Sequence, residues 1–349
     1  SEMFKYFNFL LSTLLTSSLL LHNVTEGHIQ THIDNRCPEE DIISPCQCTY
    51  WTDSDTIDLD CSLVESEEQL RQIFNSDLNI TGQATFYMGR NENIKVLRND
   101  VLGAVSFVDI IVIHGALEVV QAGALSQSEK SLKILKFVDN NLYEFPFDTI
   151  EYMPELNILD VSQNNISFCP LLINNKTKEV SLRLNPLKNI QVEAFLGLAS
   201  LKRLDLENTD LVSIEPGFLS GLSVLETVYL GHNHLTHIQQ GVFDGELHNL
   251  QRVDLSDNSI SLVEPNAFQV AKEIDINLWQ NELSILDELV WRPLFDVGIS
   301  FNIYGNPLAC GCDIAWLWQR SEYLAQVSDA QCAEGVAVQD IDPSRFDDC

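Results

Sequence analysis

Nine cysteines are the residues of this chain with the greatest capacity for covalent or metal chemistry. They lie in two clusters, one near each end, with Cys169 alone between them. The first cluster is Cys37, Cys46, Cys48 and Cys61, and the second is Cys310, Cys312, Cys332 and Cys349. An even number of cysteines on each side of a long cysteine-poor stretch predicts two disulfide-stapled ends. Structural zinc sites are the rival interpretation, less favoured because neither cluster has the C-x2-C spacing or the partner histidines that such sites use.

Cys169 has no partner in this scheme. It lies in the sequence Ile166-Ser167-Phe168-Cys169-Pro170, which is largely apolar. Apolar surroundings favour the protonated thiol, so we expect a buried and unreactive side chain. A reactive thiol or an intermolecular disulfide is the alternative.

Two further groups of side chains could hold a metal ion. His232, His234 and His237 are closely spaced, but Asn233 and Leu235 between them belong to a repeat whose side chains turn inward, which leaves surface histidines as the favoured interpretation. The acidic residues before Cys61 alternate in a way that could suit calcium, but they lack the EF-hand loop pattern. A solvated acidic strand edge is favoured for this second group, which is Asp53, Asp55, Asp58 and Asp60.

Catalytic motifs are missing from the sequence. It contains no G-x-S-x-G, no P-loop, no H-E-x-x-H and no G-x-G-x-x-G in a suitable context. We therefore expect no enzymatic activity, no cofactor and no metal site in this chain.

The composition narrows the classes of partner. The chain has 349 residues, with 51 Asp and Glu against 20 Lys and Arg, so its formal net charge is −31. Such acidity argues against nucleic-acid binding, and a hydrophobic content of 45% argues against disorder. At this length a chain usually divides into about two domains, unless it is a repeat array that grows in one direction.

The N-terminal segment has the pattern of a secretory signal. Ser1 and Glu2 precede Met3 and are interpreted as a non-native leader; Lys5 supplies the positive charge, and residues 7–21 form an apolar run. We expect a signal peptide over residues 1–27 and a linker over 28–36, with a retained signal anchor as the alternative. No later segment has the 18 consecutive apolar residues of a membrane span.

Secretion would also make N-glycosylation available. The acceptor triplets Asn79-Ile80-Thr81, Asn165-Ile166-Ser167 and Asn175-Lys176-Thr177 lie beyond the signal, so Asn79, Asn165 and Asn175 are candidate glycan sites.

A repeat with a period of 21 to 25 residues occupies the middle of the chain. Its best copies share the spacing of Leu132-x-x-Leu135-x-Phe137-x-x-Asn140-x-Leu142, and we count about ten units. The alternating apolar residues predict a short strand with one buried face, and the Asn side chain can bond backbone groups of the neighbouring coil. No unit can bury its apolar face alone, so the units must stack.

This pattern resembles the leucine-rich-repeat family. The resemblance implies an α/β fold, a horseshoe-like solenoid with parallel strands on the concave face, over residues 80–308. Cysteine-rich caps are expected at residues 37–79 and 309–349, because the motif Asn306-Pro307-Leu308-Ala309-Cys310-Gly311-Cys312 followed by Trp316-Leu317-Trp318 resembles a C-terminal cap. The family pattern implies the pairs Cys37–Cys48, Cys46–Cys61, Cys310–Cys332 and Cys312–Cys349, with both tryptophans packed over the last coil.

The repeat also predicts which side chains reach the concave face, namely those on either side of the inward strand residues. Aromatic residues and arginine are the types that most often anchor protein interfaces. The candidate binding residues are therefore Arg183, Arg203, Tyr229, Arg252, Trp279 and Tyr304. Ordinary solvated strand residues are the alternative interpretation.

Within the family, the short acidic chain and the long first gap of the N-terminal cap resemble the arthropod proteins similar to a shrimp luciferin monooxygenase non-catalytic subunit. That resemblance implies an accessory role beside a separate catalytic chain. We expect a secreted, extracellular module that binds a protein partner, such as a catalytic subunit or a receptor. The alternatives are the ectodomain of a Toll-like or adhesion receptor and a self-associating matrix protein.

Overall fold

The computed structural model describes residues 36–243, 247–269, 274–327 and 329–349. The predicted signal peptide, and all of the predicted linker except Arg36, lie outside the described residues.

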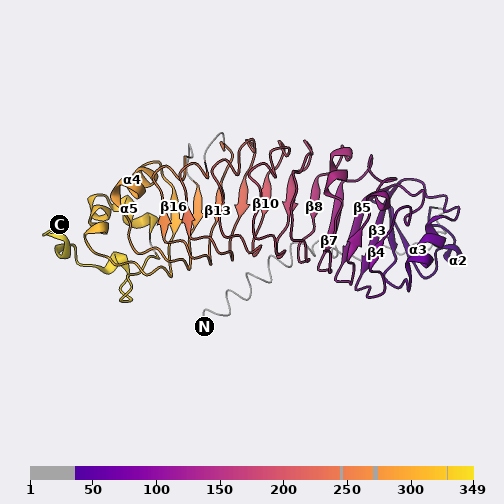
Figure 1. Ribbon diagram of the computed structural model, residues 1–349, viewed down its shortest axis with the longest axis horizontal. Coiled ribbons are helices and arrows are strands. Elements are labelled where there is room, and N and C mark those ends of the chain that lie inside the picture. Colours follow the sequence, from indigo (N-terminus) through magenta and orange to yellow (C-terminus); the bar gives the residue numbers. More distant parts are fainter. Residues whose placement is uncertain (1–35, 244–246, 270–273, 328) are drawn as a thin grey trace. The chain divides into compact units, whose positions relative to one another are not determined.

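One large sheet organises the described chain. Its twelve strands follow one another in chain order, and every neighbouring pair is parallel except the first (Figure 1). The strands are β1 (Gln47–Trp51), β2 (Thr56–Asp60), β3 (Gln83–Gly89), β5 (Phe107–Ile113), β7 (Ile134–Val138), β8 (Ile158–Asp160), β9 (Glu179–Ser181), β10 (Arg203–Asp205), β11 (Thr227–Tyr229), β13 (Arg252–Asp254), β15 (Asp275–Asn277) and β16 (Ser300–Asn302). Each strand from β3 onward opens one coil of the repeat, which confirms the predicted leucine-rich-repeat architecture.

The rest of each coil is mostly turn and loop, with short elements on the side away from the large sheet. Two small parallel sheets pair β4 (Val96–Leu97) with β6 (Val119–Val120), and β12 (His237–Ile238) with β14 (Leu262–Val263). The helical elements are α2 (Glu40–Ile43), α3 (Glu67–Phe74), η1 (Ala122–Ala124), η2 (Phe147–Tyr152), α4 (Glu288–Asp296), η3 (Cys312–Gln319), α5 (Ser321–Gln326), η4 (Val338–Asp340) and η5 (Pro343–Phe346).

The strands bury alternate side chains, as their sequences predict. In β7 the side chains of Leu135 and Phe137 are fully buried, whereas Ile134, Lys136 and Val138 are only partly covered. The register between neighbouring strands keeps equivalent positions opposite each other, so that Leu135 faces Leu159 of β8. Stacking these inward residues gives a core that runs from one cap to the other.

A ladder of buried asparagines joins successive coils. Asn233 Nδ2 donates to the carbonyl oxygen of Leu206 in the preceding coil (2.9 Å) and to that of Leu230 in its own coil (3.0 Å). Its Oδ1 accepts from the backbone N–H groups of Thr209 (2.9 Å) and Leu211 (3.0 Å). The same pattern recurs at Asn140, Asn164, Asn185, Asn258, Asn281 and Asn306. Each amide thereby satisfies backbone groups that the irregular part of a coil cannot pair by itself.

Two coils lack the asparagine. Gly115 replaces it where a Cβ would lie 2.8 Å from the carbonyl oxygen of Asn91 and 2.9 Å from Asn140 Oδ1, so the ladder position has no room for a side chain. Thr209 replaces it in another coil, where its hydroxyl donates to Leu206 O (2.7 Å) within the same coil.

The residue before each ladder position has a left-handed backbone. Asp139, Gln163, His232 and Asp257, among others, have φ between 51° and 56°. This conformation turns the chain out of the strand and is uncommon for residues other than glycine, asparagine and aspartate. It points the side chain at this position outward, which places His232 on the surface as predicted; it is 52% exposed.

The N-terminal cap extends the sheet and covers its first coil. The disulfides Cys37–Cys48 and Cys46–Cys61 are present, as the resemblance implies. Helix α3 begins at the Ser66 N-cap and buries Phe74, whose ring packs edge-on against Phe86 and Phe107 at centroid distances of 5.7 Å. This aromatic cluster closes the core at that end.

The C-terminal cap covers the last coil with α4, η3 and α5. The disulfides Cys310–Cys332 and Cys312–Cys349 have the implied pairing. Trp316 is buried and its Nε1 donates to Leu286 O (3.0 Å), while Trp318 packs against Phe346 with ring centroids 4.8 Å apart. Each cap disulfide is expected to contribute about 2–4 kcal/mol to stability.

Cys169 is buried, which confirms the sequence prediction. Its side chain is 1% exposed, and burial raises the pKa of the thiol to about 12. The thiolate is therefore scarce at neutral pH, and the side chain behaves as a small apolar group.

The asparagine ladder gives a first prediction. Asn233→Ala leaves the buried N–H groups of Thr209 and Leu211 without their acceptor, and each such group costs roughly 1–3 kcal/mol. We expect a lower urea midpoint and faster hydrogen exchange at Leu211. The exposed Asn189→Ala is the matched control. Equal midpoints for the two variants would show that the ladder contributes no stability.

Candidate functional site

The outward side of the large sheet carries the candidate binding residues. We call it the strand face. It consists of the outward side chains of β3 to β16, together with the residue three positions after the inward residue of each three-residue strand. All six predicted residues lie on it: Arg183 and Arg203 at β9 and β10, Tyr229 at β11, Arg252 at β13, and Trp279 and Tyr304 at β15 and β16. The opposite side of each strand is core and cannot contact a partner.

Acidic and amide residues at the last position of several strands have a structural role as well. Asp160 Oδ1 accepts the N–H of Ser162 (3.1 Å), and Asp254 Oδ1 accepts that of Ser256 (3.0 Å). Each bond closes a short turn where the strand ends. These acids hold the backbone in place while still giving the strand face a negative charge.

Arg203 and Tyr229 form one unit across two coils. The guanidinium of Arg203 lies 4.3 Å from the ring centroid of Tyr229, and its Nη1 donates to the phenol oxygen (2.9 Å). Arg203 Nη2 also lies 3.7 Å from Asp205 Oδ2. The structure thus fixes an aromatic ring and a cation side by side on the strand face.

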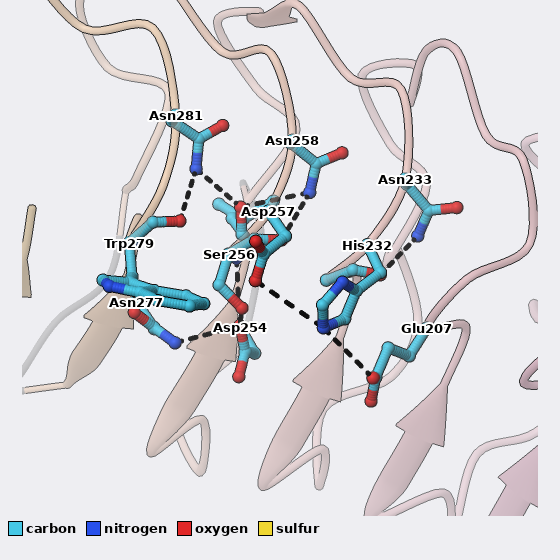
Figure 2. Close-up of polar contacts among 12 residues, drawn as sticks. Glu207, His232, Asn233, Asp254, Ser256, Asp257, Asn258, Asn277, Trp279 and Asn281 are labelled. Atoms are coloured by element: carbon cyan, nitrogen blue, oxygen red, sulfur yellow. Dashed lines mark hydrogen bonds and ion pairs between the residues drawn. The ribbon is translucent and has the colours of Figure 1, made fainter. Parts of the chain in front are cut away.

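A chain of charged side chains crosses four successive coils next to this unit. Arg183 Nη1 donates to Glu207 Oε2. His232 Nε2 lies between two carboxylates, 3.7 Å from Glu207 Oε1 and 3.6 Å from Asp257 Oδ2 (Figure 2). Arg183 therefore forms an ion pair within the chain. Of the three predicted arginines it is the least available for contact with a partner.

Burial raises the pKa values of three carboxyl groups in this region. The pKa of Asp205 is raised above its ordinary value chiefly by burial, against the opposing effects of the Glu207 N–H and of Arg203 and Arg183. Burial likewise raises the pKa of Glu207, more than the Arg183 charge lowers it, and also that of Asp257. The folded chain holds protons on these carboxyls more tightly than the unfolded chain does.

Trp279 and Tyr304 form the aromatic part of the face at its C-terminal end. Trp279 is half-buried, and Figure 2 shows its indole lying toward the neighbouring coil that carries Ser256. Its backbone N–H donates to Asn277 Oδ1 (3.2 Å), and Tyr304 in the next coil is 40% exposed. Arg252 is exposed on β13 nearby in the sheet order.

Sequence reasoning missed the aliphatic character of the N-terminal half of the strand face. Here most outward residues of three successive strands are large, apolar and partly exposed, although Asp109, Lys136 and Asp160 lie among them. The apolar residues are Ile111 and Ile113 of β5, Ile134 and Val138 of β7, and Ile158 of β8. The run Phe107-Val108-Asp109-Ile110-Ile111-Val112-Ile113, apolar at nearly every position, was the available signal, because a strand with one wet face normally alternates.

The other candidate sites have less support from the geometry. Within the part of the chain that the structure describes, no three His, Cys, Asp or Glu side chains are grouped so as to hold a metal ion. Asp55 and Asp58 instead accept hydrogen bonds from the side chains of Tyr50 (2.8 Å) and Trp51 (2.6 Å).

The candidate glycan acceptors Asn79, Asn165 and Asn175 are all exposed.

Comparisons with known proteins agree with this geometry. A family model described as "Leucine rich repeat" matches residues 175–235 and 223–283. The chain is a leucine-rich-repeat protein. It is 29% identical over 314 residues to the Oplophorus-luciferin 2-monooxygenase non-catalytic subunit of Oplophorus gracilirostris, covering 89% of this chain and 87% of that protein. It is 27% identical over 192 residues to nephrocan of Mus musculus, covering 53% of this chain and 36% of that protein.

Solved structures show the same fold. A chain in the octameric complex of Latrophilin 3, Unc5D and FLRT2 (LRR) superimposes with a TM-score of 0.67 at 20% identity, over 89% of this leucine-rich-repeat chain and 99% of the other. Among the described residues, no helix combines the length and apolar character needed to cross a bilayer.

The buried acids give a second prediction. Because the folded pKa of Asp205 is raised, its contribution to stability is present below the unfolded pKa, about 4, and is lost as pH rises through the folded value. Asp205→Asn keeps an acceptor for the Glu207 N–H and removes the titration. We therefore expect the variant to gain stability relative to the wild type as the pH rises from 4 to 7, measured by urea unfolding at both values.

The matched control is Asp160→Asn, at the equivalent position of β8 with the same turn bond but less burial. A stability difference between Asp205→Asn and wild type that is the same at both pH values would contradict the assignment.

Proposed function

We propose that this chain is a secreted, non-enzymatic binding module that recognises a protein partner through its strand face, as an accessory or scaffold subunit. The observation that carries the proposal is its similarity, over most of both chains, to a protein named as a non-catalytic subunit. A subunit that lacks catalysis acts by binding another chain. The cap disulfides fit an oxidising, extracellular compartment.

The strand face has the chemistry of a protein interface. Tyr229 and Arg203 hold each other across two coils, so this unit loses little conformational freedom on binding, and Trp279 and Tyr304 add aromatic area farther along the strand face. Such aromatic and arginine side chains dominate the binding energy of many interfaces. The aliphatic half at β5 to β8 adds apolar area beside them, so a partner spanning the face would bury both kinds of surface.

The acids on the face suggest the charge of the partner. Asp160, Asp205 and Asp254 lie on alternate strands of the large sheet, within a chain whose net charge is −31. A partner with a basic contact surface would be steered toward this face, and its association rate would fall with added salt.

The third prediction tests this function. The full chain, isolated from extracellular fluid under mild conditions, is expected to bring down a second chain in stoichiometric amount. Trp279→Ala with Tyr304→Ala should weaken that complex by at least about 30-fold, since central aromatic residues contribute on the order of 2 kcal/mol or more each. The measurement is a titration of the purified partner by calorimetry.

Tyr143→Ala is the matched control, since this tyrosine is 57% exposed but lies off the strand face. Loss of binding in the double variant with retained folding and binding in the control supports the proposal. A chain that remains alone at physiological concentration, or a complex indifferent to the double variant, would sink it and favour the receptor-ectodomain alternative.

A further inference from the structure

His232 lies at the border of the strand face, in the turn that follows β11. It comes directly after Gly231, which is the strand-face position of this coil and has no side chain. The backbone N–H of His232 donates to the carbonyl oxygen of Ser256 (2.8 Å), which holds this residue against the next coil. Its side chain is 52% exposed, so a partner on the strand face can come close to the imidazole ring.

The ring is placed between two carboxylates from different coils. His232 Nε2 lies 3.7 Å from Glu207 Oε1 in the preceding coil and 3.6 Å from Asp257 Oδ2 in the following coil (Figure 2). Both separations are too long for a hydrogen bond, so a neutral imidazole gains little from either carboxylate. A protonated imidazole carries a positive charge and is attracted to both. The ring therefore contributes differently to this surface in its two protonation states.

The two carboxylates differ in their other contacts. Asp257 Oδ2 is buried, and within the described part of the chain no hydrogen-bond donor reaches it. Glu207, by contrast, already accepts from Arg183 Nη1. Burial raises the pKa of Asp257 and the positive charge of His232 lowers it, and the same two effects act on Glu207. The proton on His232 and the charges on both carboxylates are thus linked.

The charged groups around His232 come from coils on both sides of it. They are Arg183 after β9, Arg203, Asp205 and Glu207 at β10, and Asp254 and Asp257 at β13. With two cations and four carboxylates, the formal charge of this group is −2 when the histidine is neutral and −1 when it is protonated. Histidine is the side chain whose charge changes between about pH 5 and pH 8. Acidification in that range therefore halves the negative charge at this point of the surface.

This charge change falls between two parts of the proposed interface. The Arg203–Tyr229 unit lies on β10 and β11, and Trp279 follows β15, which is two strands beyond β11 in the sheet order. His232 and Asp257 belong to the coils of β11 and β13, between these two parts. Charges act over about 8 Å in physiological salt, so a partner that contacts both parts is within range of His232.

We propose that His232 makes partner binding at the strand face sensitive to pH. This inference rests on the proposed function, and in particular on a partner with a basic contact surface. Near neutral pH the ring is uncharged, and the carboxylate of Asp257 attracts the cations of that partner. Below about pH 6 the protonated ring pairs with Glu207 and Asp257 and repels the same cations. The complex is therefore tighter in neutral fluid than in an acidified compartment.

Nuclear magnetic resonance of the full chain alone tests the electrostatic step. After isotope labelling, the side-chain carboxyl carbons of Glu207 and Asp257 report the titration of these two groups. His232→Gln removes the positive charge that lowers both pKa values, so both should rise further above their ordinary values. His234→Gln is the matched control, because His234 Nε2 lies 3.8 Å from Asp210 Oδ1 instead. Unchanged pKa values of Glu207 and Asp257 in His232→Gln would overturn the proposal.

Calorimetry tests the binding step, with the second chain that co-purifies from extracellular fluid, at about pH 7.5 and about pH 6. The wild type should bind about threefold more weakly at the lower pH. His232→Gln should bind tightly at both values, and His232→Arg, whose charge is permanent, should bind weakly at both. Both variants suit the left-handed backbone, since Gln163, Gln280 and Arg90 occupy equivalent positions with φ of 56°, 52° and 54°.

Different results would contradict the pH dependence and the proposed function. A complex with the same pH dependence in the wild type and in His232→Gln would rule out the role of His232 and leave the proposed function standing. A chain that finds no partner at either pH contradicts the proposed function, and the pH dependence falls with it. Groups that titrate on the partner affect every variant alike, so the comparison between variants isolates the effect of His232.

Discussion

The hydrogen bonds of the buried asparagine side chains are the constraint on which the rest of the molecule depends. After each strand the backbone leaves the sheet, turns through a left-handed residue and can no longer pair with its neighbours by a regular ladder. Asn233 and its equivalents supply the missing partners to two coils at once. Because an unpaired buried backbone group is costly, this bonding ties each coil to the one before it. The stack, the strand register and the continuous core all follow from that connection.

Because the coils are stacked in a fixed register, outward side chains at equivalent positions of successive coils form rows across the sheet. Neighbouring strands lie about 4.8 Å apart, so side chains at equivalent positions of successive coils are within reach of each other although 21 to 25 residues separate them in the chain. The Arg203–Tyr229 stack and the sequence of contacts from Arg183 to Asp257 both arise in this way. These rows hold large side chains in place before any partner arrives, which lowers the entropy cost of binding.

Departures from the average repeat create the surfaces that could distinguish this protein from others of its fold. The short β8 coil exposes Leu171 and Ile173, and the helical coil at α4 exposes Leu289. Asn174 compensates for the irregular path with two bonds to the carbonyl oxygens of Ile150 and Met153, so the exposed segment is well held.

Sequence alone determined the repeat, the inward residues and the nature of the ends. The spacing of Leu135, Phe137 and Asn140 can be recognised in the sequence because every coil has the same local requirements. Apolar residues must face the core, and one side-chain amide must bond the backbone groups of the turn after the strand. The cysteine spacing, through its resemblance to the family pattern, predicted the disulfide pairs of both caps. The apolar residues around Cys169 predicted that its side chain is buried. These properties depend on residues that are close together in the sequence, so a short segment is enough to predict them.

Tertiary structure decided what the outward residues do. Arg183 and Arg203 look alike in the sequence, yet one is held in an ion pair with Glu207 and the other lies on Tyr229. Neither the burial of Asp205 nor the exposure of Leu289 can be derived from the residues next to it in the chain. The reason is that an outward side chain is covered or left bare by the coils on either side of it, and their lengths and side chains set its environment.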